Sequence, residues 1–185
     1  MKLAAVVYET GQANAVDALL TATADRLRGE GYRLAGAVQH NTVQPARPCA
    51  DMIVEDLASG RRIDISAPVS PGAAGCRLDA AALEDVAGLV AAALDQRVDL
   101  LLVNRFGKQE AMGNGFRSVI ETAVAREIPV LLTLNADHLV MWESFTGGFG
   151  VILAPDLAAI DLWCRTVLTA GSCTTGHAAG APTGA

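Results

Sequence analysis

The chain has 185 residues, which is enough for one domain with a full core and short for two. Hydrophobic residues make up 51%, charged residues 18%, and the formal net charge is −6. This balance argues against a general nucleic-acid binder and against a protein that binds anionic membranes, because both need a cationic face. With so few charged residues, the surface has apolar area that a homo-oligomer would bury. An Ala-rich composition alone, however, gives the same percentages of hydrophobic and charged residues.

The cellular compartment is predicted from the absence of membrane-spanning and signal-peptide patterns in this sequence. No apolar run approaches the roughly 18 residues of a membrane-spanning helix, and Leu3 to Val7 is too short for a signal peptide. We therefore expect a cytoplasmic protein. Its four cysteines show neither C-x-x-C nor His-paired spacing, so we expect reduced thiols and no metal site; they are Cys49, Cys76, Cys164 and Cys173.

The first half of the chain alternates apolar runs with helical periodicity. The run Leu3–Tyr8 predicts a buried strand, and 9–14 predicts the turn after it. A helix follows, with Asn14 as its N-cap and Gly29 or Gly31 at its end. The next predicted elements are a strand over 32–39, a β-hairpin with arms 52–57 and 62–65 around Ala58-Ser-Gly60, and a helix from the cap Asp79 to about Gln96.

The second half continues this alternation. The run 100–103 predicts a central strand that is buried on both faces. After it we expect a tight loop at Gly113 and Gly115, strands over 130–134 and 151–153, and a short helix within 135–145 between them. Two amphipathic helices are also predicted: one over 116–126 with Phe116, Val119, Ile120 and Val124 inward, and one capped by Asp156 with Leu157, Ile160 and Val167 inward.

Alternating strands and helices are typical of an α/β fold. We expect a mostly parallel sheet with helices on both faces and a small β-hairpin insertion. Periodicity ends near Gly171, so the chain divides into a single α/β domain over 1–168 and a flexible tail over 169–185.

Polar side chains gather after two of the predicted strands. Open α/β sheets place their ligands at the carboxyl ends of their strands, so these residues are the candidate ligand contacts. Arg105 and Lys108 suit an anion that is bound directly. No catalytic residue can be assigned. The candidates are Thr10, Gly11, Gln12 and Asn14 after the first strand, and Asn104, Arg105, Lys108 and Glu110 just past the central strand.

Two other residues have both a functional and a structural interpretation. His40 could be a ligand or an acid–base group, but a lone His at a strand end is more often a polar loop residue. Trp142 could stack on a base, but a buried packing Trp is the commoner case.

The order of elements resembles the small P-loop nucleoside triphosphatases (NTPases) of the hyperthermophile type. The shared features are a strand, loop and helix, an Asp-Leu-x-x-Gly hairpin at 56–60, and Gly-Lys-x-Glu at 107–110 before a helix. Asn-Arg-Phe-Gly-Lys-x-Glu at 104–110, with Gly-x-Gly at 113–115, resembles more closely a bacterial domain family of unknown function whose relatives lie among molybdate-uptake proteins. The resemblance covers about residues 1–168. It implies a P-loop NTPase-like fold and a nucleotide or molybdate-related ligand.

The departures from an active NTPase are informative. Such enzymes carry Asp-Glu at the strand end to hold magnesium and position water, whereas this chain has Asn104 and Arg105. Its first loop has Gly11 as the only glycine and lacks the phosphate-binding Lys and the Ser or Thr for magnesium. Phosphoryl transfer depends on that charge neutralisation, so efficient hydrolysis is not expected.

Three hypotheses follow. The leading one is a degenerate P-loop-like protein that binds a nucleotide or small oxyanion without efficient hydrolysis, its cofactor unknown. The second is a weak nucleoside triphosphatase in which Glu110 or Glu9 serves as the acid. The third is a non-enzymatic partner-binding protein in which Arg105 and Glu110 form a structural ion pair.

Overall fold

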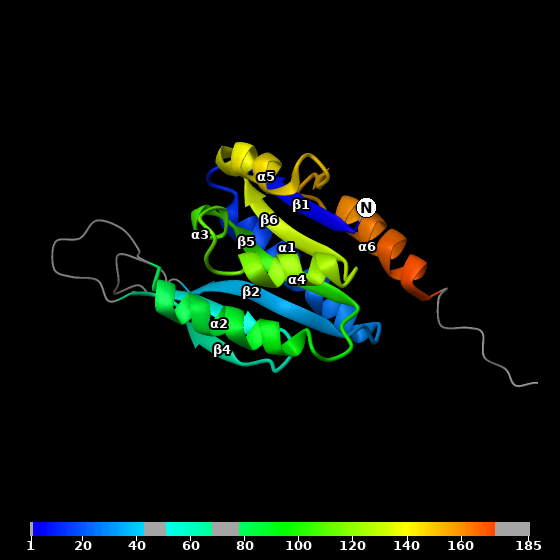
Figure 1. Cartoon of the computed structure of the whole chain (residues 1–185), viewed down its shortest axis with the longest axis horizontal. Coiled ribbons are helices and arrows are strands. Elements are labelled where there is room, and N and C mark those ends of the chain that lie inside the picture. Colours follow the sequence, from blue (N-terminus) through cyan, green and yellow to red (C-terminus); the bar gives the residue numbers. More distant parts are fainter. Residues whose placement is uncertain (1, 43–50, 68–77, 173–185) are drawn as a thin grey trace, which may run out of the picture.

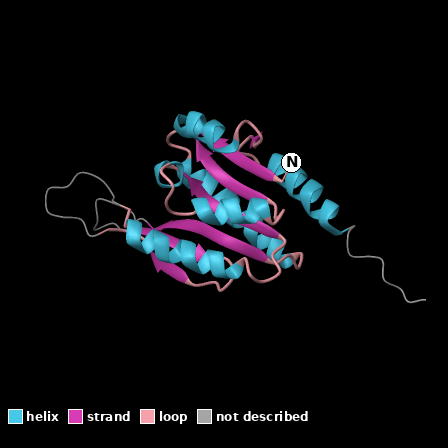
Figure 2. Ribbon diagram, in the orientation of Figure 1, coloured by secondary structure: helices cyan, strands magenta, loops and turns pink. Residues whose placement is uncertain are grey.

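The computed structural model describes residues 2–42, 51–67 and 78–172. Its sheet has seven strands in the order β4-β3-β2-β5-β6-β1-β7. Five strands run parallel and form its larger part: β1 (Leu3–Tyr8), β2 (Leu34–Thr42), β5 (Leu100–Phe106), β6 (Val130–Asn135) and β7 (Val151–Leu153). Helices cover both faces of the sheet (Figures 1 and 2). The predicted α/β class and mostly parallel sheet are confirmed.

The predicted hairpin forms one end of this sheet. Strands β3 (Asp51–Asp56) and β4 (Arg62–Asp64) are antiparallel, and β3 also pairs antiparallel with β2. In the turn between them, the buried Asp56 carboxylate accepts a hydrogen bond from the Ser59 N–H at 3.0 Å. The hairpin therefore extends the main sheet.

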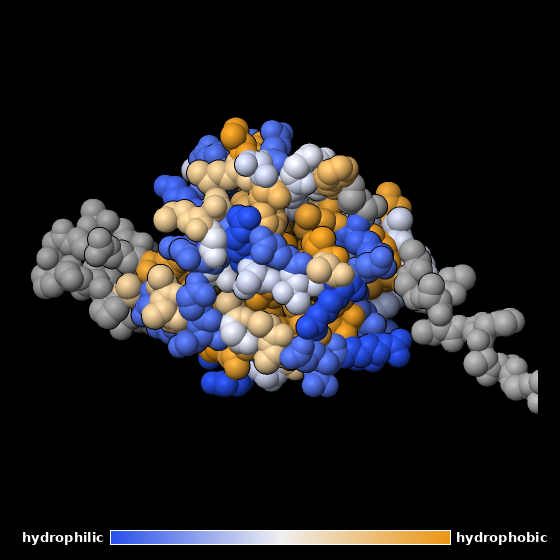
Figure 3. Space-filling model, in the orientation of Figure 1, coloured by the Kyte–Doolittle hydropathy of each residue, from blue (hydrophilic) through white to orange (hydrophobic). Residues whose placement is uncertain are grey.

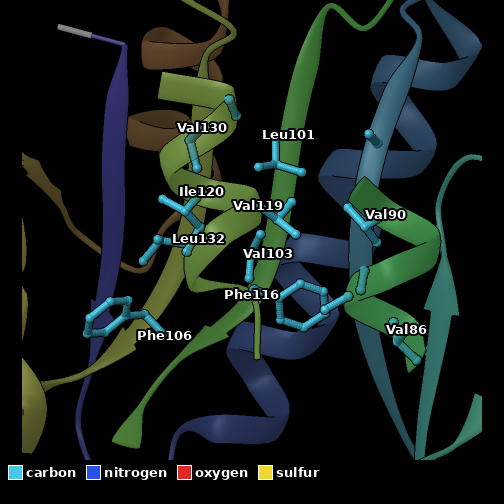
Figure 4. Packing of buried hydrophobic residues seen from close by; sticks show 14 of the residues in the cluster. Val86, Val90, Leu101, Val103, Phe106, Phe116, Val119, Ile120, Val130 and Leu132 are labelled. Carbon is cyan, nitrogen blue, oxygen red and sulfur yellow. The ribbon is translucent and has the colours of Figure 1, made fainter. Parts of the chain in front are cut away.

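Helices α1 (Ala13–Gly29) and α6 (Leu157–Ser172) cover one face, and α2 (Ala80–Ala93) and α4 (Arg117–Ala125) cover the other. On the second face, Val86 and Val90 of α2 and Val119 and Ile120 of α4 point toward the sheet (Figure 4). Three short helices complete the described chain: α3 (Lys108–Ala111), the 3-10 turn η1 (Ala136–His138) and α5 (Leu139–Thr146).

The central strand β5 belongs to both cores because its side chains alternate between the two faces. Leu100 and Leu102 pack with α1 and α6, whereas Leu101 and Val103 pack with α2 and α4. All four are fully buried, which explains the continuous apolar run in the sequence.

Most predicted helix boundaries hold, but one predicted cap and two predicted inward-facing residues need correction. Asp79 caps α2 as predicted, but Gln12 occupies the N-cap position of α1, and Asn14 lies inside its first turn. Val124 is 46% exposed and Leu157 is 44% exposed, so both inward predictions were wrong. Val119, Ile120 and Ala123 already form the inner stripe of α4, and Val124 is rotated away from it.

Several predictions concern residues outside the described ranges. Cys49, Cys76, Cys173 and the predicted loop over 68–77 lie there, whereas Cys164 is buried and free. The predicted tail begins at 169, but α6 continues to Ser172; 173–185 lie outside the described residues. Within the described ranges, no helix combines the length and apolarity needed to cross a membrane.

Candidate functional site

The candidate site lies where β1, β5 and β6 end side by side. The sheet register brings Tyr8 of β1 opposite Asn135 of β6. Strand β5 is longer than predicted, so Asn104 and Arg105 belong to the strand itself and do not follow it. Asn104 and Arg105 therefore lie at the carboxyl edge of the sheet as the last part of β5, not as a loop after it.

A β-bulge gives the end of β5 an irregular geometry. Val103 lies opposite Leu132 and Phe106 lies opposite Leu134, so β5 has one residue more than β6 over this stretch. Adjacent residues of a regular strand point to opposite faces, yet Asn104 and Arg105 both hydrogen-bond to one residue of α1. Their peptide bond is cis.

That residue of α1 is Asp17, which the sequence analysis did not single out. One of its carboxylate oxygens, Oδ1, accepts from Asn104 Nδ2 at 2.8 Å and from Arg105 Nη2 at 3.0 Å. Asn104 Oδ1 in turn accepts from the Thr133 hydroxyl at 2.8 Å. Asp17, Asn104 and Thr133 are all buried, so this is an internal chain of hydrogen bonds linking β6, β5 and α1.

Arg105 lies at the outer end of this chain. Its side chain is 31% exposed, against 7% for Asp17, and its guanidinium lies 5.6 Å from the centre of the Tyr8 ring. Burial raises the pKa of Tyr8, although the neighbouring Arg105 charge opposes this shift. Arg105 Nε is buried and has no hydrogen-bond partner among the described residues. We call Tyr8, Asp17, Asn104, Arg105 and Thr133 the Arg105 cluster.

The first loop is a tight turn of four residues between β1 and α1. Glu9 O accepts from Gln12 N at 3.0 Å, and the Gln12 side chain accepts from Glu9 N at 2.9 Å. Gly11 has φ +96°, a conformation that favours glycine. The Thr10 hydroxyl donates to Asp137 Oδ2 at 3.3 Å, which ties this loop to the segment after β6.

The loop leads into an open helix N-terminus. The first N–H groups of a helix have no partner inside the helix and carry partial positive charge. The Gln12 side chain does not cap α1, and the first turn contains no acidic residue. The N–H groups at this end of α1 can therefore donate hydrogen bonds to an anion.

Glu110, the remaining acidic candidate, has a different environment. Its residue is 3% exposed, and its carboxylate accepts from Gly107 N at 2.8 Å and from Phe116 N at 3.2 Å. Burial raises its pKa, while these backbone donors oppose the shift. Gly115 has φ +60°, and a Cβ there would lie 2.5 Å from Glu110 Oε1. Glu110 thus holds the 107–116 loop together from inside.

These contacts overturn the proposed Arg105–Glu110 ion pair. Arg105 pairs with Asp17, because the bulge in β5 turns it toward α1, and Glu110 binds backbone groups of its own loop. Lys108 is exposed on the short helix α3 and makes no ion pair with any other described residue.

The two residues with competing interpretations both have packing or pairing roles. Trp142 is 1% exposed and packs edge-on against Phe106 with ring centres 5.5 Å apart, which confirms the structural interpretation. His40 lies inside β2, not in a loop as expected, and its Nε2 is 3.0 Å from Glu55 Oε2.

Sequence reasoning missed three members of the Arg105 cluster: Tyr8, Asp17 and Thr133. A signal for Asp17 was present, because an acidic residue within the apolar stripe of Val16 and Leu20 needs a buried partner. Nothing comparable identified Thr133, since a Thr is ordinary in a strand.

Comparison with known proteins places the chain among its relatives. It is 39% identical over 164 residues to the Molybdenum import ATP-binding protein ModC 2 of Bradyrhizobium diazoefficiens, covering 89% of this chain but only 18% of the length of that curated relative. Its fold is similar to the crystal structure of THEP1 from the hyperthermophile Aquifex aeolicus, with a TM-score of 0.60, 15% identity, and coverage of 91% of this chain and 98% of that one. This confirms the expected likeness to the hyperthermophile-type P-loop NTPase fold. Residues 3–163 match the family described as Protein of unknown function (DUF2478), to which this chain belongs.

Proposed function

We propose that the chain binds a nucleotide or another small oxyanion at the carboxyl edge of its sheet. The observation that carries this proposal is the position of Arg105, whose partly exposed side chain contacts Asp17 in the helix whose N-terminus is open. Arg105 offers charged donors, and the first turn of α1 offers backbone N–H groups. The proposed contacts are Thr10, Gly11, Gln12 and Asn14 from the first loop and helix, with Arg105 and Lys108.

Two of the predicted ligand residues receive indirect roles in this proposal. Asn104 is buried and positions Asp17 and therefore Arg105. Glu110 shapes the loop that carries Lys108, because its carboxylate is engaged by Gly107 and Phe116.

The ligand class is supported by the relatives. The Bradyrhizobium protein is named as an ATP-binding protein of molybdenum import, and the solved neighbour has a P-loop NTPase fold. Both favour a nucleotide, and the first name also supports molybdate as a candidate oxyanion. A nucleotide ligand fits the cytoplasmic location that we propose, and the net charge of −6 supports the absence of a nucleic-acid partner.

We further propose that hydrolysis is inefficient. The four-residue first loop contains no Lys, and the end of β5 carries Asn104 and Arg105 where an active enzyme has acids. Each missing charged group costs several kcal/mol of transition-state stabilisation. Purified protein should hydrolyse ATP or GTP no faster than the Arg105→Ala variant. Magnesium-dependent turnover that disappears in Glu110→Gln would instead support the enzyme hypothesis.

A thermal-shift screen tests the binding proposal. ATP, ADP, GTP, phosphate, sulfate, molybdate and tungstate are compared at constant ionic strength, because a ligand that binds the folded state raises Tm. At least one should raise the Tm of the wild type and of Arg165→Ala, which removes an exposed arginine of α6. The same ligand should have a smaller effect on Arg105→Ala. Equal shifts in both variants would place the ligand elsewhere.

An apolar groove favours a second candidate function, partner binding through self-association. The groove has a volume of about 630 Å³ and lies between α4, the start of β1 and the segment after α5. Hydrophobic atoms reach the surface between α4 and α5 in Figure 3. Val124 and Phe149 in its lining are 46% and 69% exposed. Sedimentation of the wild type and Phe149→Ser tests it: a homo-oligomer that dissociates in the variant would support this function, and a monomeric wild type would remove it.

A further inference from the structure

We infer that Asp17 determines which oxyanions the Arg105 site accepts, favouring those that carry a proton over fully deprotonated dianions. The inference rests on the proposed function, because it concerns the selectivity of the same site. The ligand class it specifies is a hydrogen-bearing phosphate, either inorganic phosphate or a phosphate monoester in its singly charged form.

The geometry makes Asp17 a resident counter-ion of Arg105. Arg105 Nη2 lies 3.0 Å from Oδ1 and 3.2 Å from Oδ2 of this carboxylate. Asn104 Nδ2 fixes Oδ1 from the strand side, and Thr133 fixes Asn104. The Asp17 side chain is only 7% exposed, so solvent screens its charge poorly. The carboxylate therefore cannot swing away from Arg105 without leaving Asn104 Nδ2 unpaired.

An anion that reaches Arg105 must bind beside this fixed negative charge. The guanidinium is already paired, so the anion gains less attraction than it would from a free arginine, and it is repelled by Asp17 across a few ångströms. The repulsion grows with the charge of the anion. Nearby acids add to it, since Asp137 bonds to Thr10 of the first loop and Glu9 begins that loop.

A proton on the anion changes this balance. An O–H of hydrogen phosphate can donate to a carboxylate oxygen, which converts a repulsive contact into a charge-assisted hydrogen bond. Asp17 is the carboxylate that contacts Arg105, and it also lines a surface hollow of about 480 Å³ along α1 together with Asn14. Sulfate and molybdate carry no proton near neutral pH and gain nothing from Asp17. The resident carboxylate thus penalises fully deprotonated dianions and tolerates phosphates that carry a proton.

The test compares phosphate, sulfate and molybdate by calorimetric titration at about pH 6.5 and constant ionic strength, with wild type, Asp17→Asn and Arg105→Ala. The wild type should bind phosphate about tenfold more tightly than sulfate or molybdate, which corresponds to one charge-assisted hydrogen bond. Asp17→Asn keeps an oxygen and the side-chain shape but loses the charge. It should bind sulfate and molybdate about tenfold more tightly than the wild type does, so that the preference for phosphate disappears.

The outcomes separate the inference from the function on which it rests. Wild-type protein that binds sulfate or molybdate as tightly as phosphate would overturn the inference, and this holds even if Asp17→Asn does not fold. If folded Asp17→Asn binds all three anions more weakly by the same factor, the inference is also overturned, because Asp17 would then only support the structure of the site. If no anion binds to wild type or to either variant, the proposed oxyanion function itself fails.

Discussion

Two neighbouring polar regions lie at the carboxyl end of β5, and they differ in whether their charged side chains point into the protein or toward the surface. In the 107–116 loop the buried Glu110 carboxylate accepts from two backbone N–H groups of its own loop. In the Arg105 cluster the buried Asp17 leaves Arg105 partly exposed beside the open end of α1. Within one short motif, therefore, Glu110 is buried and closes its loop, whereas Arg105 reaches the surface. Burial and hydrogen-bond partners distinguish the two.

The largest expected effect concerns the closed region. Glu110→Ala leaves the N–H groups of Gly107 and Phe116 without their acceptor, so the free energy of unfolding should fall by about 2 to 4 kcal/mol. Urea denaturation measures this fall. Glu143→Ala, which removes an exposed glutamate on α5, serves as the control and should change stability little. A mild effect at Glu110 would show that the loop does not depend on its carboxylate.

A smaller effect is expected inside the open region. Thr133→Val removes the donor to Asn104 Oδ1 and should lower the free energy of unfolding by about 1 kcal/mol. Because Asn104 fixes Asp17, anion affinity should change as well. Thr166→Val on the exposed side of α6 is the matched control. Unchanged stability and affinity would mean that the hydrogen-bond chain from β6 to α1 contributes nothing to the site.

The smallest effect is expected at the opposite edge of the sheet, where Arg33 pairs with Asp99 at 2.8 Å. Hydrogen bonding from Arg33 lowers the pKa of Asp99, so this carboxylate stabilises the fold above its ordinary pKa, and that contribution is lost as the pH falls through the folded-state pKa. The stability difference between wild type and Asp99→Asn should therefore shrink from neutral to strongly acidic pH. The control is Asp85→Asn, which replaces an exposed aspartate of α2. A difference that grows in acid would contradict the assigned sign.

The sequence predicted the fold better than the site, for physical reasons. A strand such as Leu100–Val103 is specified by local hydrophobicity, and Asp79 caps its helix through neighbouring N–H groups. The Asp17–Arg105 pair joins residues 88 positions apart and depends on a one-residue bulge in β5. No local pattern reports such a bulge. Glu110 was predicted to contact a ligand because the sequence does not show that it is buried. Its burial arises only when the 107–116 loop folds around it.

The most direct test of the central claim is calorimetric titration of Arg105→Ala and Arg165→Ala with the ligand that most raises the Tm of the wild type. The claim is that Arg105, at the open edge, provides the binding charge. Arg105→Ala should weaken binding by about 1.5 to 3 kcal/mol, the range for a hydrogen bond to a charged group, while Arg165→Ala binds as the wild type does. Melting curves of both variants identify the folded range. Unchanged affinity in folded Arg105→Ala would contradict the claim and leave Arg105 as a structural partner of Asp17.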